Sequence, residues 1–161
     1  SIVPAPNSAD LQPVAQDYIT RLLNHLNYVG VLTLELFVTD KGLYANEMAP
    51  RVHNSGHWSI EGAVCSQFEN HIRAVAGLPL GSTEVVRPTV MINIIGQYPQ
   101  SEQVLALEGV HLHLYNKEER EGRKIGHLTL MPNDTTQLTM LCRQLAKILP
   151  NPLALSEDMT I

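Results

Sequence analysis

The chain has 161 residues, which suits one ordinary domain or two small ones. Hydrophobic residues make up 44% of it and charged residues 17%, so it can bury a core and does not belong to the disordered class. A formal net charge of −5 argues against a general nucleic-acid or anionic-membrane binder. No signal peptide or membrane-length apolar run is visible, and Cys65 and Cys142 form no CxxC pair. We therefore expect a cytoplasmic protein that binds neither nucleic acid nor membrane.

The first residues, SIVPAPNSADL, lack an initial methionine and are typical of a strand end followed by a loop, so we expect a piece of a longer protein. Ser8 or Asp10 is predicted to cap a helix that has Pro13 in its first turn and runs to about Asn27. Apolar residues recur there at every fourth position and predict an amphipathic helix: Val14, Tyr18, Leu22 and Leu26.

The next segment predicts a hairpin followed by a second helix. GVLTLELFV is rich in β-branched and aromatic residues and predicts a strand over 31–38, and LYANE returns after the turn TDKG. The second helix is expected over 66–76 and ends at Gly77. Its inward-facing residues are predicted to be Phe68, Ile72 and Val75.

The pattern changes from Arg87 onward. TVMINIIG, VHLHLYN and KIGHLTL predict three strands, and a helix over 135–149 is expected between its cap Asp134 and Pro150. The buried stripe of that helix is predicted to be Leu138, Leu141, Leu145 and one of Ile148 and Leu149. These features predict two domains, 1–86 and 87–161.

Two glutamates on the predicted hairpin are candidate ligands for a divalent cation. If residues 40–42 form a three-residue loop, Thr39 lies opposite Leu43. Glu35 then lies opposite Glu47, with both side chains on one face. Like charges about 5 Å apart repel, whereas a divalent cation between them makes the arrangement favourable. A two-residue loop is the alternative, and it would shift the register by one residue and leave one glutamate exposed.

The hairpin runs into the polar segment NEMAPRVHNSGHW, which spans Asn46 to Trp58. LELFVTDKGLYANEMAPRVHNSGHW resembles the last part of the ATP-grasp fold. Within that superfamily the APRVHNSGHW string resembles the N5-carboxyaminoimidazole ribonucleotide synthetase family, and the likeness continues through SQFENHIRAVAGLPL, MINIIG and HLHLYNKEEREGRKIGHLTL. It implies an α+β chain: the C-terminal half of an ATP-grasp domain, then a small β-rich domain with a closing helix.

The resemblance also implies an activity and its participants. Family members use ATP to phosphorylate bicarbonate, and carboxyphosphate or its CO₂ is captured by the amine of 5-aminoimidazole ribonucleotide in purine biosynthesis. Mg²⁺, or Mn²⁺, would be held by Glu35 and Glu47, and Asn46 would lie beside Glu47 at the ATP site. Ala49 stands where many ATP-grasp enzymes carry an asparagine metal ligand, so fewer protein ligands are expected.

Further roles follow from the same resemblance. Arg51 would bind bicarbonate or its phosphorylated form, because a guanidinium suits planar oxyanions. His53 and Asn54 would orient the intermediate or the amine. The full-length family member is expected to be a homodimer.

The segment KEEREGRK is a basic loop between two predicted strands. Its charge pattern fits a solvated hairpin tip, since three glutamates are interleaved. The resemblance instead assigns Lys117 and Arg123, with Lys124 as a weaker candidate, to the 5′-phosphate of the ribonucleotide.

Other functions remain open from the residues alone. A structural zinc site is disfavoured because His53 and His57 have no cysteine near them in the sequence. The alternatives are another ATP-grasp ligase and a binding module without catalysis. No GxxxxGK loop is present. The phosphate-binding elements of the ATP-grasp fold would precede Ser1, so this chain alone is expected to be inactive.

Overall fold

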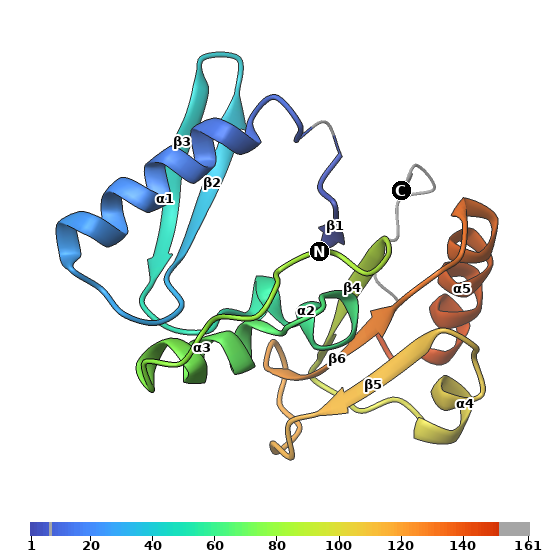
Figure 1. Cartoon of the computed structure of the whole chain (residues 1–161). Coiled ribbons are helices and arrows are strands. Elements are labelled where there is room, and N and C mark those ends of the chain that lie inside the picture. Colours follow the sequence, from blue (N-terminus) through green and yellow to red (C-terminus); the bar gives the residue numbers. More distant parts are fainter. Residues whose placement is uncertain (7, 152–161) are drawn as a thin grey trace. The chain divides into compact units, whose positions relative to one another are not determined.

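The structure is a computed structural model that describes residues 1–6 and 8–151 (Figure 1). Its contacts divide the chain into two compact units. One unit is Asn7–Val85, here called the hairpin unit, and the other, the sheet unit, combines Ser1–Pro6 with the chain from Val86 onward. Residues 1–6 thus make their contacts with the sheet unit. Both units combine helices with antiparallel strands, which confirms the α+β class. Within the described residues no helix is long and apolar enough to cross a membrane.

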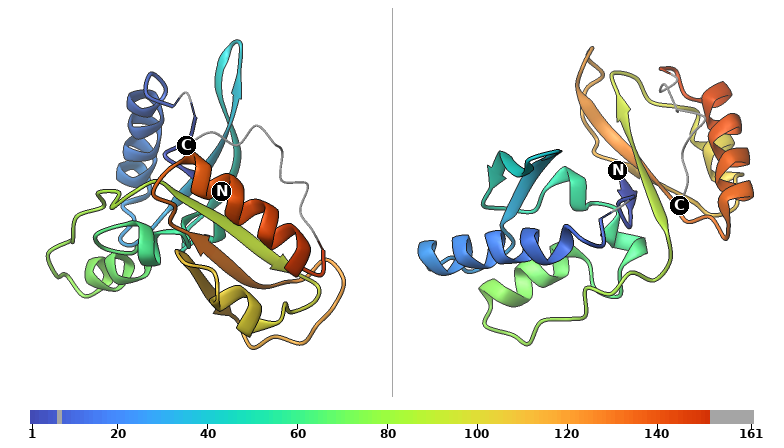
Figure 2. Two further views of the ribbon diagram at one scale, coloured as in Figure 1. Left: turned by 90° about the vertical axis from the view of Figure 1, so that its right-hand side faces the viewer. Right: turned by 90° about the horizontal axis from the view of Figure 1, so that it is seen from above.

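The hairpin unit contains one two-stranded sheet and three α-helices. Strands β2 (Thr33–Thr39) and β3 (Gly42–Ala49) form the hairpin, and α1 (Gln12–Leu26) crosses one side of it (Figures 1 and 2). A 3₁₀ turn (Asn54–Gly56), α2 (Ser59–Gly62) and α3 (Gln67–Val75) follow.

The helix starts are only partly as predicted. Pro13 lies in the first turn of α1, as expected, but the residue before the helix is Leu11 and no side chain caps it. The backbone carbonyl of Ser8 accepts hydrogen bonds from the N–H groups of Leu11 and Gln12 instead, so the predicted cap at Ser8 or Asp10 is wrong. The predicted start of α3 is confirmed, because the Ser66 side chain accepts a hydrogen bond from the Glu69 N–H.

The predicted inward face of α3 is wrong, and the apolar positions of α1 are not buried either. Ile72 and Val75 of α3 are 64% and 62% exposed, and Phe68 is 37% exposed. No residue of α1 is buried, and Val14, Tyr18 and Leu26 all count among the exposed apolar residues. The physical reason is that this unit offers only a two-stranded sheet, which is too small to cover two amphipathic helices.

The sheet unit is built on four antiparallel strands in the order β1-β4-β6-β5. Their bounds are Ile2–Val3 for β1, Thr89–Ile95 for β4, Val110–Leu114 for β5 and Lys124–Leu130 for β6. The three predicted strands correspond to β4, β5 and β6. Helices α4 (Ser101–Leu105), which the sequence did not predict, and α5 (Thr135–Ile148) lie on the same face of this sheet (Figure 2).

The main hydrophobic cluster of the described chain lies in the sheet unit, under α5. Asp134 caps α5 by accepting a hydrogen bond from the Gln137 N–H at 2.7 Å, as predicted. The predicted stripe is also confirmed, since Leu138, Leu141 and Leu145 are at most 1% exposed and Leu149 is 7% exposed. The closing helix therefore holds the sheet together from one side.

Replacing Leu145 with alanine is expected to lower the free energy of unfolding of the sheet unit by about 2–5 kcal/mol, because it leaves a cavity in the core. Met140 on the same helix is 50% exposed, so Met140→Ala should change that free energy by only about 0.5 kcal/mol. Urea denaturation followed by circular dichroism measures both values. Equal losses in the two variants would contradict the packing of α5.

Candidate active site

The hairpin brings Glu35 and Glu47 opposite each other, although its loop is not the one predicted. Thr39 pairs with Gly42, so the loop has two residues, Asp40 and Lys41. The predicted pairing of Thr39 with Leu43 is therefore wrong. Glu35 nevertheless pairs with Glu47, as predicted.

A β-bulge at Asn46 resolves this apparent conflict. Leu36 pairs with Ala45 and Glu35 pairs with Glu47, so Asn46 is one extra residue on β3. The bulge shifts the register by one position and cancels the shift made by the shorter loop. Directly paired residues project to the same face, so both carboxylates lie on one side of the hairpin. The Asn46 side chain donates to Glu35 Oε2 at 3.4 Å.

His53 contacts both carboxylates. Its Nδ1 lies 3.4 Å from Glu35 Oε1, and its Nε2 lies 3.5 Å from Glu47 Oε1. The two carboxylates therefore contact the two nitrogens of one imidazole ring. The His53 side chain is 12% exposed, against 33% for Glu35 and 52% for Glu47. This contact ties the segment after the hairpin to both acidic side chains.

A divalent cation with oxygen ligands fits this arrangement. Two adjacent carboxylates repel, and a hard cation such as Mg²⁺ is commonly held by one or two carboxylates together with phosphates and water. Within the described chain, no group of three or more His, Cys, Asp or Glu side chains is arranged to hold a metal ion. The site thus fits an ion that takes most of its ligands from a substrate.

Arg51 and Asn54 flank His53 on the segment that follows β3. The Arg51 guanidinium is exposed and donates to the Val52 carbonyl at 3.0 Å. None of the four ion pairs in the described chain involves Arg51. Its charge is therefore accessible to an anion. Asn54 is partly buried and begins the 3₁₀ turn.

The basic loop lies between β5 and β6 in the sheet unit. No ion pair of the described chain includes Lys117, Arg120 or Arg123, so the interleaved glutamates do not neutralise these cations through direct contact. Arg123 is partly buried, and its carbonyl accepts a hydrogen bond from Gly96 N–H at 2.8 Å. Lys124 is the first residue of β6 and is exposed.

Tyr98 holds the start of this loop, a role that the sequence did not reveal. Its hydroxyl donates to the Lys117 carbonyl at 2.7 Å and accepts from the Lys117 N–H at 2.9 Å. Its own N–H donates to Glu119 Oε1 at 2.7 Å. The Lys117 ammonium lies 5.1 Å from the centre of the Tyr115 ring, whose hydroxyl is 2.7 Å from Nδ1 of the buried His127. Backbone and side chain of Lys117 are thus both positioned.

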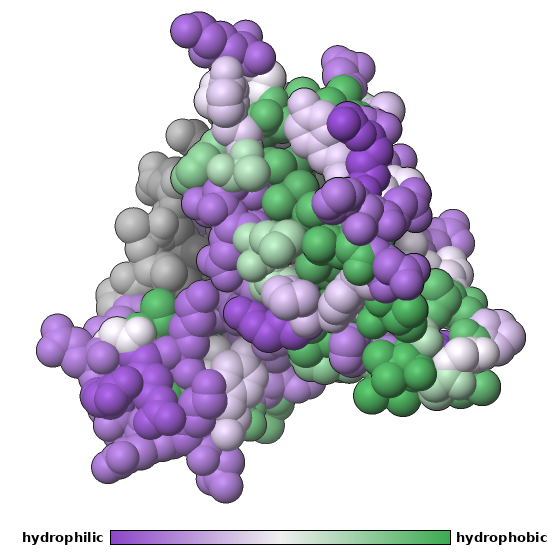
Figure 3. Space-filling view, turned by 90° about the vertical axis from the view of Figure 1, so that its left-hand side faces the viewer, coloured by the Kyte–Doolittle hydropathy of each residue, from purple (hydrophilic) through white to green (hydrophobic). Residues whose placement is uncertain are grey.

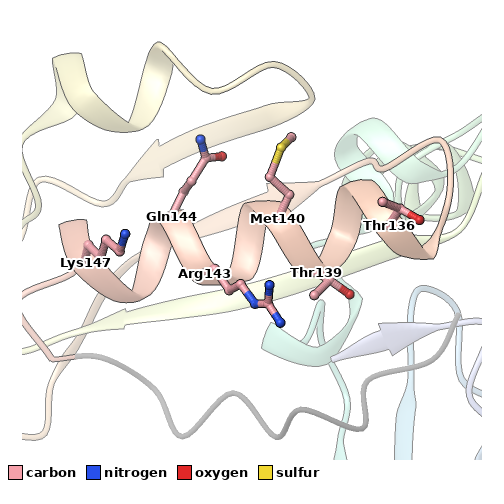
Figure 4. Close-up of a pocket in the computed structure, with 6 residues that line it drawn as sticks. All are labelled: Thr136, Thr139, Met140, Arg143, Gln144 and Lys147. Atoms are coloured by element: carbon pink, nitrogen blue, oxygen red, sulfur yellow. The ribbon is translucent and has the colours of Figure 1, made fainter.

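Two surface hollows of the described chain do not coincide with these clusters. One lies along α5 and is lined by the side chains drawn in Figure 4: Thr136, Thr139, Met140, Arg143, Gln144 and Lys147. Another is lined by α1: Tyr18, Arg21, Leu22, Asn24 and His25. Neither includes a candidate site residue, so the site is defined by its converging polar groups.

Comparison with known proteins identifies the family. Residues 1–68 match the model of the ATP-grasp domain, and residues 89–140 match the model of the phosphoribosylaminoimidazole carboxylase C-terminal domain. The chain is 58% identical over 134 residues to the N5-carboxyaminoimidazole ribonucleotide synthase of Pseudomonas aeruginosa. The chain belongs to the N5-carboxyaminoimidazole ribonucleotide synthase family. The match covers 83% of this chain and 37% of that synthase, so the chain spans about two fifths of the length of the curated relatives it matches.

Solved structures of the synthase family have the same fold. The synthetase of Thermus thermophilus superposes with a TM-score of 0.88 at 50% identity, covering 93% of this chain and 42% of that one. The synthase of Aspergillus clavatus, in complex with ADP and 5-aminoimidazole ribonucleotide, gives a TM-score of 0.82 at 31% identity and covers 93% of this chain and 43% of that one.

Mg²⁺ is expected to raise the melting temperature of the chain, because it binds the folded carboxylate pair and not the unfolded chain. At ten times its dissociation constant the stabilisation would be about 1.4 kcal/mol. Glu35→Gln and Glu47→Gln should each lose this shift. Asp40→Asn removes a charge from the tip of the same hairpin and should retain it. Differential scanning fluorimetry measures all four proteins, and a full shift in either glutamate variant would contradict the site.

Proposed function

We propose that this chain forms part of an ATP-dependent carbon–nitrogen ligase that carboxylates 5-aminoimidazole ribonucleotide to N5-carboxyaminoimidazole ribonucleotide in purine biosynthesis. ATP and bicarbonate are its other substrates, and carboxyphosphate is the intermediate. The observation that carries this proposal is the Glu35–Glu47 pair with His53 against both carboxylates, within a chain of the synthase family.

In this proposal Glu35 and Glu47 hold Mg²⁺, or Mn²⁺, at the ATP phosphates. The ion would neutralise charge on the transferring phosphoryl group. Asn46 lies beside Glu47 at the nucleotide and restrains Glu35 through its 3.4 Å hydrogen bond. The bulge supports this assignment, because bulges commonly redirect side chains next to active sites.

The segment after the hairpin would receive bicarbonate. Arg51 offers an exposed guanidinium, which suits a planar oxyanion or its phosphorylated form. His53 and Asn54, the next polar residues along the segment, would orient the intermediate or the amine. His53 would also hold the carboxylates in their paired position.

Lys117 and Arg123, with Lys124 at the end of the loop, would bind the 5′-phosphate of the ribonucleotide. Both Lys117 and Arg123 lack an ion pair within the described chain, and the Tyr98 hydroxyl fixes the Lys117 backbone. A dianionic phosphate would satisfy these cations with charge-assisted hydrogen bonds.

The remaining proposals concern the whole protein. We expect residues 1–86 to belong to the ATP-grasp domain and 87–161 to the small terminal domain of a cytoplasmic homodimer. The hairpin unit exposes much apolar surface, and Figure 3 shows apolar surface on the side of the molecule that carries α1. The rest of the synthase fold would cover this surface and supply the phosphate- and adenine-binding elements. The chain alone should therefore be inactive.

A hybrid enzyme tests the proposed activity. In it, this chain replaces the matching region of the Pseudomonas aeruginosa synthase, to which it is 58% identical. With ATP, Mg²⁺ and bicarbonate, the hybrid should release ADP at a rate that 5-aminoimidazole ribonucleotide increases. Glu47→Gln should abolish the increase, because it removes one proposed metal ligand.

The parent synthase is the positive control, and the 161-residue chain by itself should release no ADP. A folded hybrid that binds ATP without responding to the ribonucleotide would point to another acceptor amine. Failure to bind Mg·ATP would favour a binding module, and ribonucleotide-dependent hydrolysis by the isolated chain would refute its expected inactivity.

The basic loop can be tested in the same hybrid. Lys117→Ala and Arg123→Ala should each raise the KM for the ribonucleotide by about tenfold or more, because each loses a charge-assisted contact worth about 1.5–3 kcal/mol. The KM for ATP should stay nearly constant. Lys147→Ala removes an exposed cation from α5 and should change neither value. Equal increases in the KM for both substrates would contradict a phosphate site in this loop.

A further inference from the structure

A glutamine on α3 holds the backbone of His53. Gln67 Oε1 accepts from the His53 N–H at 3.0 Å, and Gln67 Nε2 donates to the His53 carbonyl at 2.8 Å. The second Nε2 proton is directed to His57 Nδ1, also 2.8 Å away. One carboxamide therefore pairs with both backbone groups of His53, as a neighbouring strand would, and these backbone partners fix which end of the carboxamide is oxygen.

The loop between His53 and Gln67 is shaped around this contact. A Cβ atom on Gly56 would come within 2.6 Å of Gln67 Oε1, so the close approach requires glycine at that position. The buried Ser59 hydroxyl donates to the Gly56 carbonyl at 2.6 Å and accepts from the Gln67 N–H at 2.9 Å. Two side chains thus join this loop to the start of α3.

We propose that Gln67 is the positioning residue for His53 and, through it, for the Glu35–Glu47 pair. The proposal rests on the function proposed above for that pair. Fixing both backbone groups of His53 leaves its ring only side-chain rotation, and the ring contacts a carboxylate on each side. Without Gln67 the 53–56 turn can move, and the imidazole no longer holds both carboxylates.

Asn70 provides a matched control on the same helix. Its carboxamide holds Gly81 in the same way, since Oδ1 accepts from the Gly81 N–H at 2.8 Å and Nδ2 donates to the Gly81 carbonyl at 3.2 Å. Asn70 is buried and lies one helical turn after Gln67. Loss of either carboxamide removes a pair of hydrogen bonds to the backbone of one residue, but only Gln67 holds a residue that contacts the carboxylate pair.

Amide hydrogen exchange of the 161-residue chain tests the two hydrogen bonds between Gln67 and the His53 backbone, and it requires no enzymatic activity. In Gln67→Met the His53 amide should exchange faster by about tenfold, as expected for loss of its acceptor, while the Gly81 amide keeps its rate. In Asn70→Leu the pattern should reverse. Unchanged exchange at His53 in Gln67→Met, with the fold intact by circular dichroism, would overturn the proposal.

Kinetics of the hybrid enzyme test the positioning role. Gln67→Met should lower kcat/KM for bicarbonate by about 10–100-fold, the usual cost of removing a residue that orients a ligand group. Asn70→Leu should lower it by less than about threefold. Equal losses in the two variants would show that Gln67 only stabilises the fold, and would overturn the proposal.

A double-mutant cycle with Gly56 adds a second readout. Gly56→Ala should displace Gln67 and reproduce most of the Gln67→Met defect, whereas the double variant should be no worse than Gly56→Ala alone. Independent, additive losses would refute the coupling. If the unmodified hybrid is inactive, the proposed function fails, and the exchange rates at His53 still decide whether Gln67 holds it.

Discussion

Two like charges opposite each other on one hairpin face are the constraint on which the rest of this site depends. Glu35 and Glu47 are adjacent because a two-residue loop and a one-residue bulge shift the register in opposite directions. In the folded chain His53 lies against both carboxylates. Such a pair is unfavourable in itself, and its presence at a bulge next to a polar segment fits the cation-binding role proposed for it.

In both units, one side chain forms hydrogen bonds with both backbone groups of a residue that has a proposed function. His53 and Lys117 lie on segments outside the strand ladders, where backbone N–H and C=O groups need other partners. Gln67 supplies both partners for His53, and the Tyr98 hydroxyl supplies both for Lys117. In each case one polar side chain on a neighbouring segment fixes a residue that is expected to meet substrate.

The sheet unit was the part most accessible from sequence. The stripe containing Leu138 and Leu145 and the cap at Asp134 are local signals, and they specified α5 because its packing follows its own periodicity. The hairpin unit was less accessible. Ile72 and Val75 fit an amphipathic pattern, yet periodicity indicates only which face is apolar and not whether another layer covers it.

The glutamate pairing in the site was predicted correctly, but from a loop length that the hairpin does not have. Glu35 and Glu47 do face each other, but the sequence argument used a three-residue loop, and nothing in the pattern around Asn46 marked a bulge. Gln67 and Tyr98 were missed because their partners are backbone groups 14 and 19 residues away, which no local spacing reveals. Gly56 carries the one available signal, since a glycine within a polar loop can indicate a close approach by another group.

The most direct test of the carboxylate pair is anomalous diffraction from crystals of the hybrid enzyme grown with Mn²⁺ and a non-hydrolysable ATP analogue. The account predicts a manganese peak in direct coordination with carboxylate oxygens of both Glu35 and Glu47. A structure with the nucleotide bound and the metal held elsewhere, or by neither glutamate, would contradict it.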